Sequence, residues 1–259
     1  MLQLTRHGEG GHVVEVALDR PSAMNAISTD LAREITATTA ALAADDSVRA
    51  VVLTSTHERA FCVGADLKER NGFTDAQLMD HRLVSKLAYR GVLDLPVPAV
   101  AAVEGFALGG GLELALSCDL IVAGEQATLG LPEVGVGVIP GGGGTQLVTR
   151  RVGWSRAASM IFTGRRMTAK EAHRLGVLDE LVEAGTARDR ALEIAAQIAG
   201  NSPVAVRNAK RAMRLGMGVD LAAGLEIEDG AWRATAFSGD RKEGVAAFAE
   251  KRAPRWPGR

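Results

Sequence analysis

The chain has 259 residues with nearly balanced charge, because 30 Lys and Arg face 31 Asp and Glu, for a formal net charge of -1. This balance argues against a dedicated binder of nucleic acid or of an anionic membrane surface. Two cysteines are too few for a disulfide framework or a zinc site, and no apolar run is long enough to span a bilayer. The N-terminus has no apolar signal region. We therefore expect a cytoplasmic protein with one main domain and a small appendage.

Strand and helix patterns alternate through the first two thirds of the chain. The predicted strands are 13–18, 50–54, 97–103, 120–123, 127–129 and 177–182. The predicted helices of this part are 28–44, the second half of 71–91, 110–118, one ending near 150, 155–162 and a short one starting at Thr168. Segment 71–91 has the weakest apolar pattern, so we expect it to be the most mobile segment.

The last third is predicted to be helical only, over 186–199, 203–215, 221–236 and 240–251. Asp240 and Glu243 suit a capping box at the start of the last helix. The change in pattern predicts a core over residues 1–195 and a C-terminal helical domain over 196–259.

A basic stripe at helical spacing lies in the predicted helix 203–215 and consists of Arg207, Lys210, Arg211 and Arg214. We interpret this stripe first as a solvated helix face, second as a phosphate contact and third as an RNA-binding surface.

The stretch 103–115 gives the clearest indication of a functional site. An apolar run leads into three glycines at 109–111 and then into an apolar segment, which predicts a strand, a tight turn and a helix. The first amides of a helix lack partners within it and favour negative charge, so the Gly110 N–H would belong to an anion site. Glu113 follows about one helical turn later and would face the same pocket. On this stretch alone, the simpler interpretation is an acid in a helix's first turn.

A second glycine-rich stretch covers residues 135–145. It lacks the Lys-Ser/Thr signature of a P-loop. It also lacks the dinucleotide fingerprint, because Pro140 stands where the third glycine should be. We therefore exclude nucleotide hydrolysis and NAD binding at this stretch.

Three stretches together resemble the crotonase (enoyl-CoA hydratase/isomerase) superfamily, and within it the enoyl-CoA and methylglutaconyl-CoA hydratase branches. They are residues 61–67, 105–115 and 131–146, with supporting matches over 18–26 and 243–252. The resemblance implies an α/β fold, a spiral of repeated ββα units with a C-terminal all-helical trimerisation part. It also implies a homotrimer or a hexamer built as a dimer of trimers. The implied substrate is an acyl-CoA thioester, with no cofactor beyond its coenzyme A and no metal.

The resemblance also assigns site residues. Ala65 and Gly110 would supply two backbone N–H groups that hold the thioester oxygen, and Glu113 and Glu133 would be the catalytic pair. The further residues implied in substrate and CoA binding are Met24, Ala26, Asp66, Leu67, Lys68, Phe248 and Lys251. Val63 and Gly135 depart from the family's common pattern near the pocket, which leaves the acyl-chain preference open.

Two carboxylates suit the addition of water to a 2-enoyl thioester. The addition builds negative charge on the thioester oxygen, which fixed N–H donors stabilise. One carboxylate can activate water while the other serves the α-carbon, and we expect Glu113 and Glu133 in these roles. The presence of both acids favours a hydratase over an isomerase. The alternatives are a methylglutaconyl-CoA hydratase, an enoyl-CoA isomerase or a retro-Claisen enzyme. A non-catalytic CoA-thioester-binding or RNA-binding protein is the less favoured class.

Overall fold

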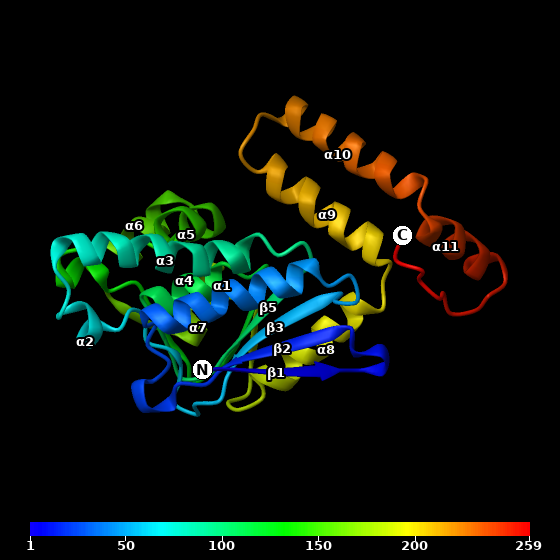
Figure 1. Cartoon of the computed structure of the whole chain (residues 1–259). Coiled ribbons are helices and arrows are strands. Elements are labelled where there is room, and N and C mark those ends of the chain that lie inside the picture. The colour runs from blue at the N-terminus through cyan, green and yellow to red at the C-terminus, as the bar shows by residue number, and fades with distance from the viewer.

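The computed structural model describes residues 1–259, and their first two thirds form two sheets (Figure 1). The larger sheet has the order β1 (Leu2–His7), β2 (Val13–Leu18), β3 (Ala50–Ser55), β5 (Ala99–Val103), β7 (Leu120–Gly124) and β10 (Glu180–Val182). The smaller sheet has the order β4 (Ala60–Cys62), β6 (Phe106–Leu108), β8 (Thr128–Gly130) and β9 (Arg166–Thr168). The pairs β1–β2 and β8–β9 are antiparallel, and all other neighbours are parallel.

Successive strand pairs form a repeated unit, because the chain crosses from the larger to the smaller sheet and then enters a helical segment. This happens at β3–β4, at β5–β6 and at β7–β8. The helical segments that follow are α2 (Leu67–Arg70) with α3 (Asp75–Leu93), then α4 (Gly110–Leu116), then η3 (Glu133–Val136) with α5 (Gly144–Val152) and α6 (Trp154–Thr163). The predicted spiral of ββα units is confirmed. Strand β6 lies where we expected only a tight turn.

Helices cover both faces of the larger sheet, because neighbouring residues of a strand point to opposite sides. On one face, α8 (Ala187–Ala199) packs four alanines spaced four residues apart against side chains such as Val52 and Val100. On the other face, α1 (Thr29–Ala44) and α3 pack over the main core with side chains such as Val51 and Leu53. The predicted domain boundary at residue 195 falls inside α8, whose Ala195 and Ala199 both belong to this packing. The remaining short helices are η1 (Glu9–Gly11), η2 (Pro21–Ala23) and α7 (Ala169–Leu175).

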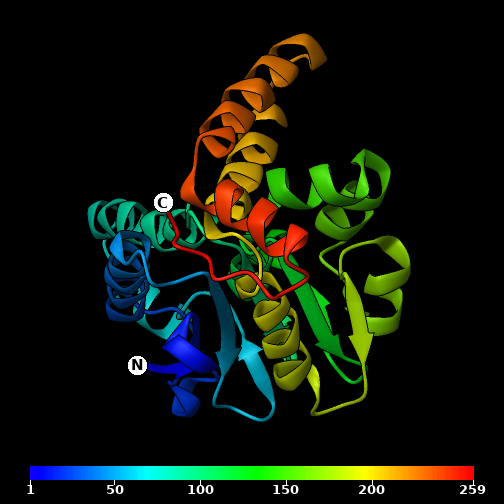
Figure 2. The same cartoon turned by 90° about the vertical axis from the view of Figure 1, so that its right-hand side faces the viewer.

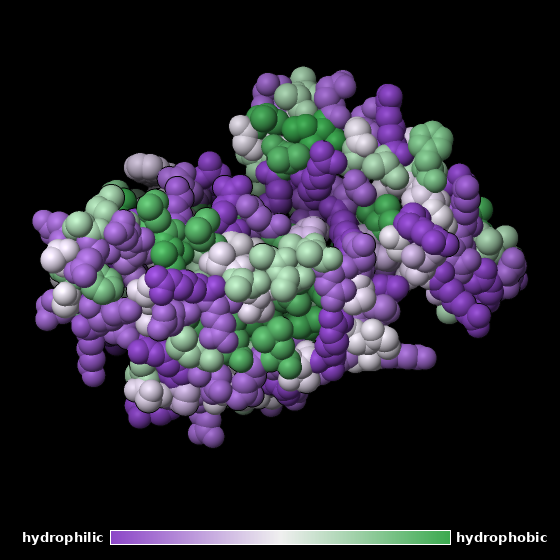
Figure 3. All heavy atoms as spheres, viewed as in Figure 1, coloured by the Kyte–Doolittle hydropathy of each residue, from purple (hydrophilic) through white to green (hydrophobic).

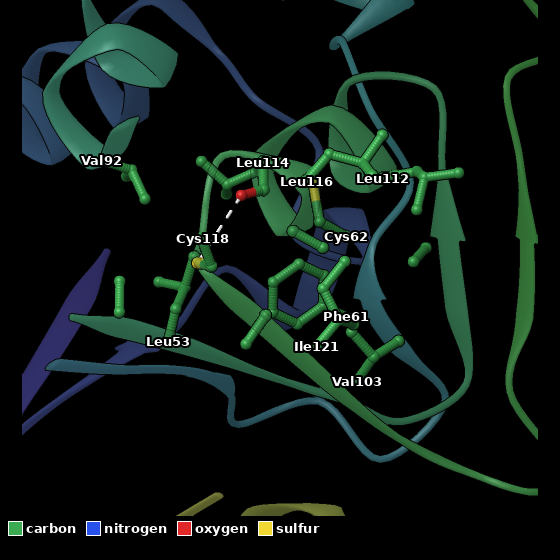
Figure 4. Close-up of a cluster of buried hydrophobic side chains, with 14 of the residues drawn as sticks. Leu53, Phe61, Cys62, Val92, Val103, Leu112, Leu114, Leu116, Cys118 and Ile121 are labelled. Carbon is green, nitrogen blue, oxygen red and sulfur yellow. Dashed lines mark hydrogen bonds between the residues drawn. The ribbon is translucent and has the colours of Figure 1, made fainter. Parts of the chain in front are cut away.

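Helix α4 lies inside the main core, and every one of its residues is buried. Figure 4 shows its leucines beside Phe61 of β4 and Ile121 of β7. Both cysteines are free and buried in this cluster, and burial raises the pKa of each thiol to about 12. Neither thiol is therefore ionised near neutral pH. This packing holds α4 in place, so the backbone and side-chain groups of its first turn have a fixed position.

The C-terminal part consists of α9 (Pro203–Gly216), α10 (Leu221–Ala236) and α11 (Gly239–Ala249), and α9 and α10 lie side by side away from the sheets (Figures 1 and 2). The only buried residue of α10 is Ala231. Exposed apolar side chains gather over the end of the α9–α10 pair (Figure 3). They are Met213, Leu215, Met217, Val219, Leu221 and Leu225. None of the helices combines the length and the apolar content needed to cross a bilayer.

The basic stripe of α9 joins the helices to the core, so the prediction of a solvated face is wrong for three of its four residues. Lys210 is buried, and its Nζ donates to the Val97 carbonyl at 2.8 Å and to Asp119 at 2.7 Å. Arg214 donates to the other oxygen of Asp119 at 2.9 Å. Arg207 donates to Asp46 and to the Val48 carbonyl. Only Arg211 is exposed without such a contact.

The predicted capping box of the last helix is also wrong. Ser238 caps α11, and its hydroxyl accepts from the Arg241 amide at 3.0 Å. Asp240 is buried and accepts from the Ser202 hydroxyl at 2.6 Å, which ties α11 to the start of α9. Glu243 instead binds the Arg252 guanidinium.

Candidate active site

The turn after β4 lies directly against the start of α4. Gly64 has a φ of +94°, and a Cβ on it would lie 3.0 Å from the Gly110 nitrogen. Only glycine allows this approach without strain. The Ala65 amide donates no hydrogen bond within the chain, and the Gly110 amide, first in α4, has no acceptor within its helix. The two expected N–H donors therefore lie on neighbouring backbone segments, and both are available.

Glu133 opens η3 and lies over Gly109, where a Cβ would be 3.1 Å from the glutamate Oε1. Both carboxyl oxygens are enclosed and have no hydrogen-bond partner. Burial raises the pKa of Glu133 to about 7. The backbone N–H of Glu133 acts to lower this pKa, and the Glu113 charge acts to raise it further. A carboxyl with this pKa can both give and accept a proton near neutral pH.

Glu113 is also buried, but the backbone holds its carboxylate. Its Oε1 accepts hydrogen bonds from the Gly142 amide at 2.6 Å and from the Gly144 amide at 2.8 Å. Burial raises the pKa of Glu113, while these amides and the Arg82 charge act in the opposite direction. The second oxygen, Oε2, forms no hydrogen bond within the chain. The glycine-rich stretch therefore binds a carboxylate of its own chain.

Helix α3 supplies two groups of the site that the sequence pattern did not reveal. Arg82 donates to the Gly141 carbonyl at 2.6 Å and so links α3 to the glycine-rich loop. Tyr89 is buried, and its hydroxyl lies 2.3 Å from where a Cβ on Gly110 would be. The segment expected to be mobile begins this helix with a capping box between Thr74 and Gln77. Its mobility stays a prediction.

Arg20 joins two of the expected binding residues, although the sequence analysis gave it no role. It donates to Asp66 at 2.7 Å and to the Ala26 carbonyl at 2.8 Å, and the Met24 carbonyl accepts from the Val63 amide. Asp66 also caps α2. Burial opposes its ionisation, but the Arg20 guanidinium and the α2 amides hold the pKa of Asp66 below its ordinary value. Leu67 and Lys68 follow on the exposed side of α2.

Phe248 and Lys251 lie apart from these residues. Figure 1 places α11 and the following turn at the opposite end of the molecule from α2. Phe248 is 88% exposed, and Lys251 is exposed as well. Within one chain, the structure does not bring these two residues to the site.

The arrangement can polarise a carbonyl group and move protons beside it. Two neighbouring N–H groups can bind one oxygen on which charge develops. One enclosed glutamate titrates near neutral pH, and a second is held by amides with one oxygen free. Groups with such separated environments are typical of an acid–base pair.

Known proteins show the same sequence pattern and the same fold. The family model described as enoyl-CoA hydratase/isomerase matches residues 8–259. The YngF protein of Bacillus subtilis (strain 168) is 45% identical over 243 residues, which are 93% of each chain. Human mitochondrial methylglutaconyl-CoA hydratase is 39% identical over 254 residues, or 96% of this chain and 75% of that protein. A crystal structure of enoyl-CoA hydratase from Bacillus anthracis has a TM-score of 0.96 at 40% identity and covers 100% of this chain and 99% of that one.

Proposed function

Because this chain belongs to the enoyl-CoA hydratase/isomerase family, we propose that it is a 2-enoyl-CoA hydratase. The reaction adds water reversibly to a trans-2-enoyl-CoA thioester and gives a 3-hydroxyacyl-CoA. The observation that carries this proposal is the pair Glu113 and Glu133. Both lie beside the Gly110 turn, and their environments differ: the Glu133 oxygens are enclosed without a partner, whereas two backbone amides bind Glu113 Oε1.

In the proposed reaction, the Ala65 and Gly110 N–H groups bind the thioester oxygen. They stabilise the enolate that forms when water attacks the β-carbon, and losing one such donor typically costs about 10²–10³ in rate. Glu113 accepts the water proton on Oε2 while the water oxygen bonds to the β-carbon. Glu133, protonated at its pKa of about 7, gives its proton to the α-carbon. Both glutamates then exchange protons with solvent.

The second candidate is hydration of a branched 2-enoyl thioester, which the similarity to human methylglutaconyl-CoA hydratase favours. The two candidates share every step above and differ only in the acyl group that the pocket admits. Double-bond isomerisation needs no water, so the placement of Glu113 with a free Oε2 favours it less.

We also infer a homotrimer, or a hexamer of two trimers. The exposed apolar side chains of α9 and α10 support this assembly, because a second copy would remove them from water. Phe248 and Lys251 would then reach the coenzyme A of a neighbouring copy.

A cytoplasmic location stays a prediction, and several relatives are mitochondrial proteins.

The test compares Glu133→Gln and Glu113→Gln with the native protein on crotonyl-CoA. The signal is the loss of ultraviolet absorbance of the conjugated thioester, with chiral analysis of the 3-hydroxyacyl product. We expect each variant to lose about 10²–10⁴ in kcat. Glu228→Gln is the matched control, because it makes the same change on an exposed residue of α10, and it should keep native turnover.

The possible outcomes test the roles of the two glutamates separately from the hydratase assignment. A folded glutamate variant with near-native turnover contradicts the role of that residue. A native protein that hydrates neither crotonyl-CoA nor a branched enoyl-CoA contradicts the hydratase assignment. Conversion of a 3-enoyl-CoA to the 2-enoyl isomer would then identify an isomerase.

A further inference from the structure

Tyr89 places a hydroxyl at the centre of the site. It is the only tyrosine of the chain, it is 6% exposed, and it lies on α3. Its ring packs against Gly142, where a Cβ would lie 2.7 Å from the ring. Its hydroxyl lies beside Gly110, where a Cβ would be 2.3 Å away. The missing side chains of these two glycines thus make room for this one phenol.

The Tyr89 hydroxyl forms no hydrogen bond with any other group of the chain, unlike the buried hydroxyls of Thr39, Thr54 and Ser85. Unlike the two carboxyl oxygens of Glu133, this hydroxyl is not fully enclosed, so a small molecule in the site can reach it. The hydroxyl therefore faces a position that a bound molecule can satisfy.

The position of the ring tells which part of the site the hydroxyl serves. Gly142, which the ring contacts, is also the residue whose amide donates to Glu113 Oε1. Burial and the Glu113 charge keep the pKa of the phenol well above its ordinary value, so the phenol stays protonated. Its ring lies against the same backbone segment that binds the Glu113 carboxylate.

We propose that the Tyr89 hydroxyl positions the reacting water against Glu113. Glu113 Oε2 accepts one O–H of the water and the Tyr89 oxygen accepts the other, which leaves a lone pair directed at the β-carbon. The water proton passes to Glu113 as the new C–O bond forms, and the phenol keeps its own proton. This inference rests on the proposed hydratase function and adds a water-binding residue to it.

The test uses Tyr89→Phe with two reactions that share all groups except the water. The first is hydration of crotonyl-CoA. The second is exchange of the α-protons of butyryl-CoA in D₂O, followed by NMR, which uses the backbone donors and Glu133 but adds no water. Losing one hydrogen bond to the reacting water should lower kcat for hydration about 10- to 100-fold, with KM and the exchange rate unchanged within about twofold.

Ser85→Ala is the matched control, because it removes another buried hydroxyl of α3 that bonds only the Arg82 carbonyl of its own helix. It should leave both reactions native. Tyr89→Phe keeps the ring, so its thermal unfolding should match the native protein.

Three results overturn the inference. Native hydration by Tyr89→Phe shows that the hydroxyl holds no water. An equal fall of hydration and exchange places the hydroxyl on the thioester oxygen instead. A native protein that exchanges α-protons but hydrates nothing removes the hydratase function itself, and this outcome is recognised before any variant is made.

Discussion

At the scale of single residues, two glutamates with enclosed carboxyl groups show that partners decide the charge more than burial does. Glu15 is 4% exposed, and burial opposes its ionisation, yet Arg188, His7 and Thr54 bind it and lower its pKa to about 2. Glu133 has enclosed oxygens and no partner, and its pKa is about 7. Glu15 is suited to hold β2 and α8 together, whereas Glu133 is suited to transfer a proton.

The raised pKa of Glu133 predicts a pH-dependent stability difference between native protein and Glu133→Gln. The folded pKa of about 7 exceeds the ordinary value of 4.5, so the folded state binds this proton more tightly than the unfolded state. The resulting stability is fully present below pH 4.5 and is lost as the pH rises through 7. Glu133→Gln lacks this loss, so its stability relative to native should rise by about 2–3 kcal/mol between pH 4.5 and pH 8. Urea unfolding at both pH values measures this difference, and an equal difference at both would contradict it.

The sequence identified Glu113 and Glu133 because their spacing from the glycines belongs to recognisable stretches. It did not identify Tyr89, since a tyrosine at a buried helix position is indistinguishable in sequence from a packing residue. Its significance depends on contacts with Gly110 and Gly142, which lie far along the chain. Arg82 escaped notice for the same reason.

At the scale of elements, the loop before α5 positions Glu113, and its glycines are not equivalent. A Cβ on Gly144 would lie 2.9 Å from Glu113 Oε1 and 2.9 Å from the Pro140 Cβ, so Gly144→Ala must displace the carboxylate. A misplacement of about 1 Å can cost about 10²-fold in rate, and we expect a loss of this order in kcat for hydration. Gly141→Ala adds a Cβ that meets only the Arg82 side chain, at an ordinary 3.6 Å, so it should cost much less. Native turnover by Gly144→Ala would show that these amides do not position Glu113.

Elements without a clear apolar pattern of their own were the ones that the sequence could not predict. Strand β1 has mostly exposed residues, and it forms because β2 offers a free edge. Strands β6 and β9 have three residues each, too few for any periodicity to show. Asp240 has the right spacing for a cap, but its carboxylate binds Ser202, a partner 38 residues away. In each case a tertiary contact decided the outcome.

At the scale of the whole molecule, Asp119 joins the helical part to the sheets. Its carboxylate accepts from the Ala99 amide at 2.8 Å, from Lys210 at 2.7 Å and from Arg214 at 2.9 Å. Asp119→Ala leaves the buried Lys210 charge without its partner, which should lower the free energy of unfolding by about 3–5 kcal/mol. Lys210→Met removes the charge together with its need for a partner and should cost less. Urea unfolding of both variants tests this order, and an equal loss would contradict it.

The family resemblance predicted the spiral of ββα units and the helical end, but not how the two parts join. We predicted a solvated face for the basic stripe because its acidic partner is far away in sequence. Lys210 and Asp119 are 91 residues apart. Charge patterns within one helix reveal neighbours on that helix, and they do not reveal partners from another element.

The close approach of the Gly64 backbone to the Gly110 backbone has an evolutionary consequence. The proposed donors to the thioester oxygen are main-chain groups, and replacing the side chain of Ala65 leaves its N–H in place. Glu113, Glu133 and Tyr89 are side chains, and one codon change can remove any of them. A lineage built on this scaffold would therefore inherit enolate stabilisation almost unchanged. What the enolate then does could diversify, one substitution at a time.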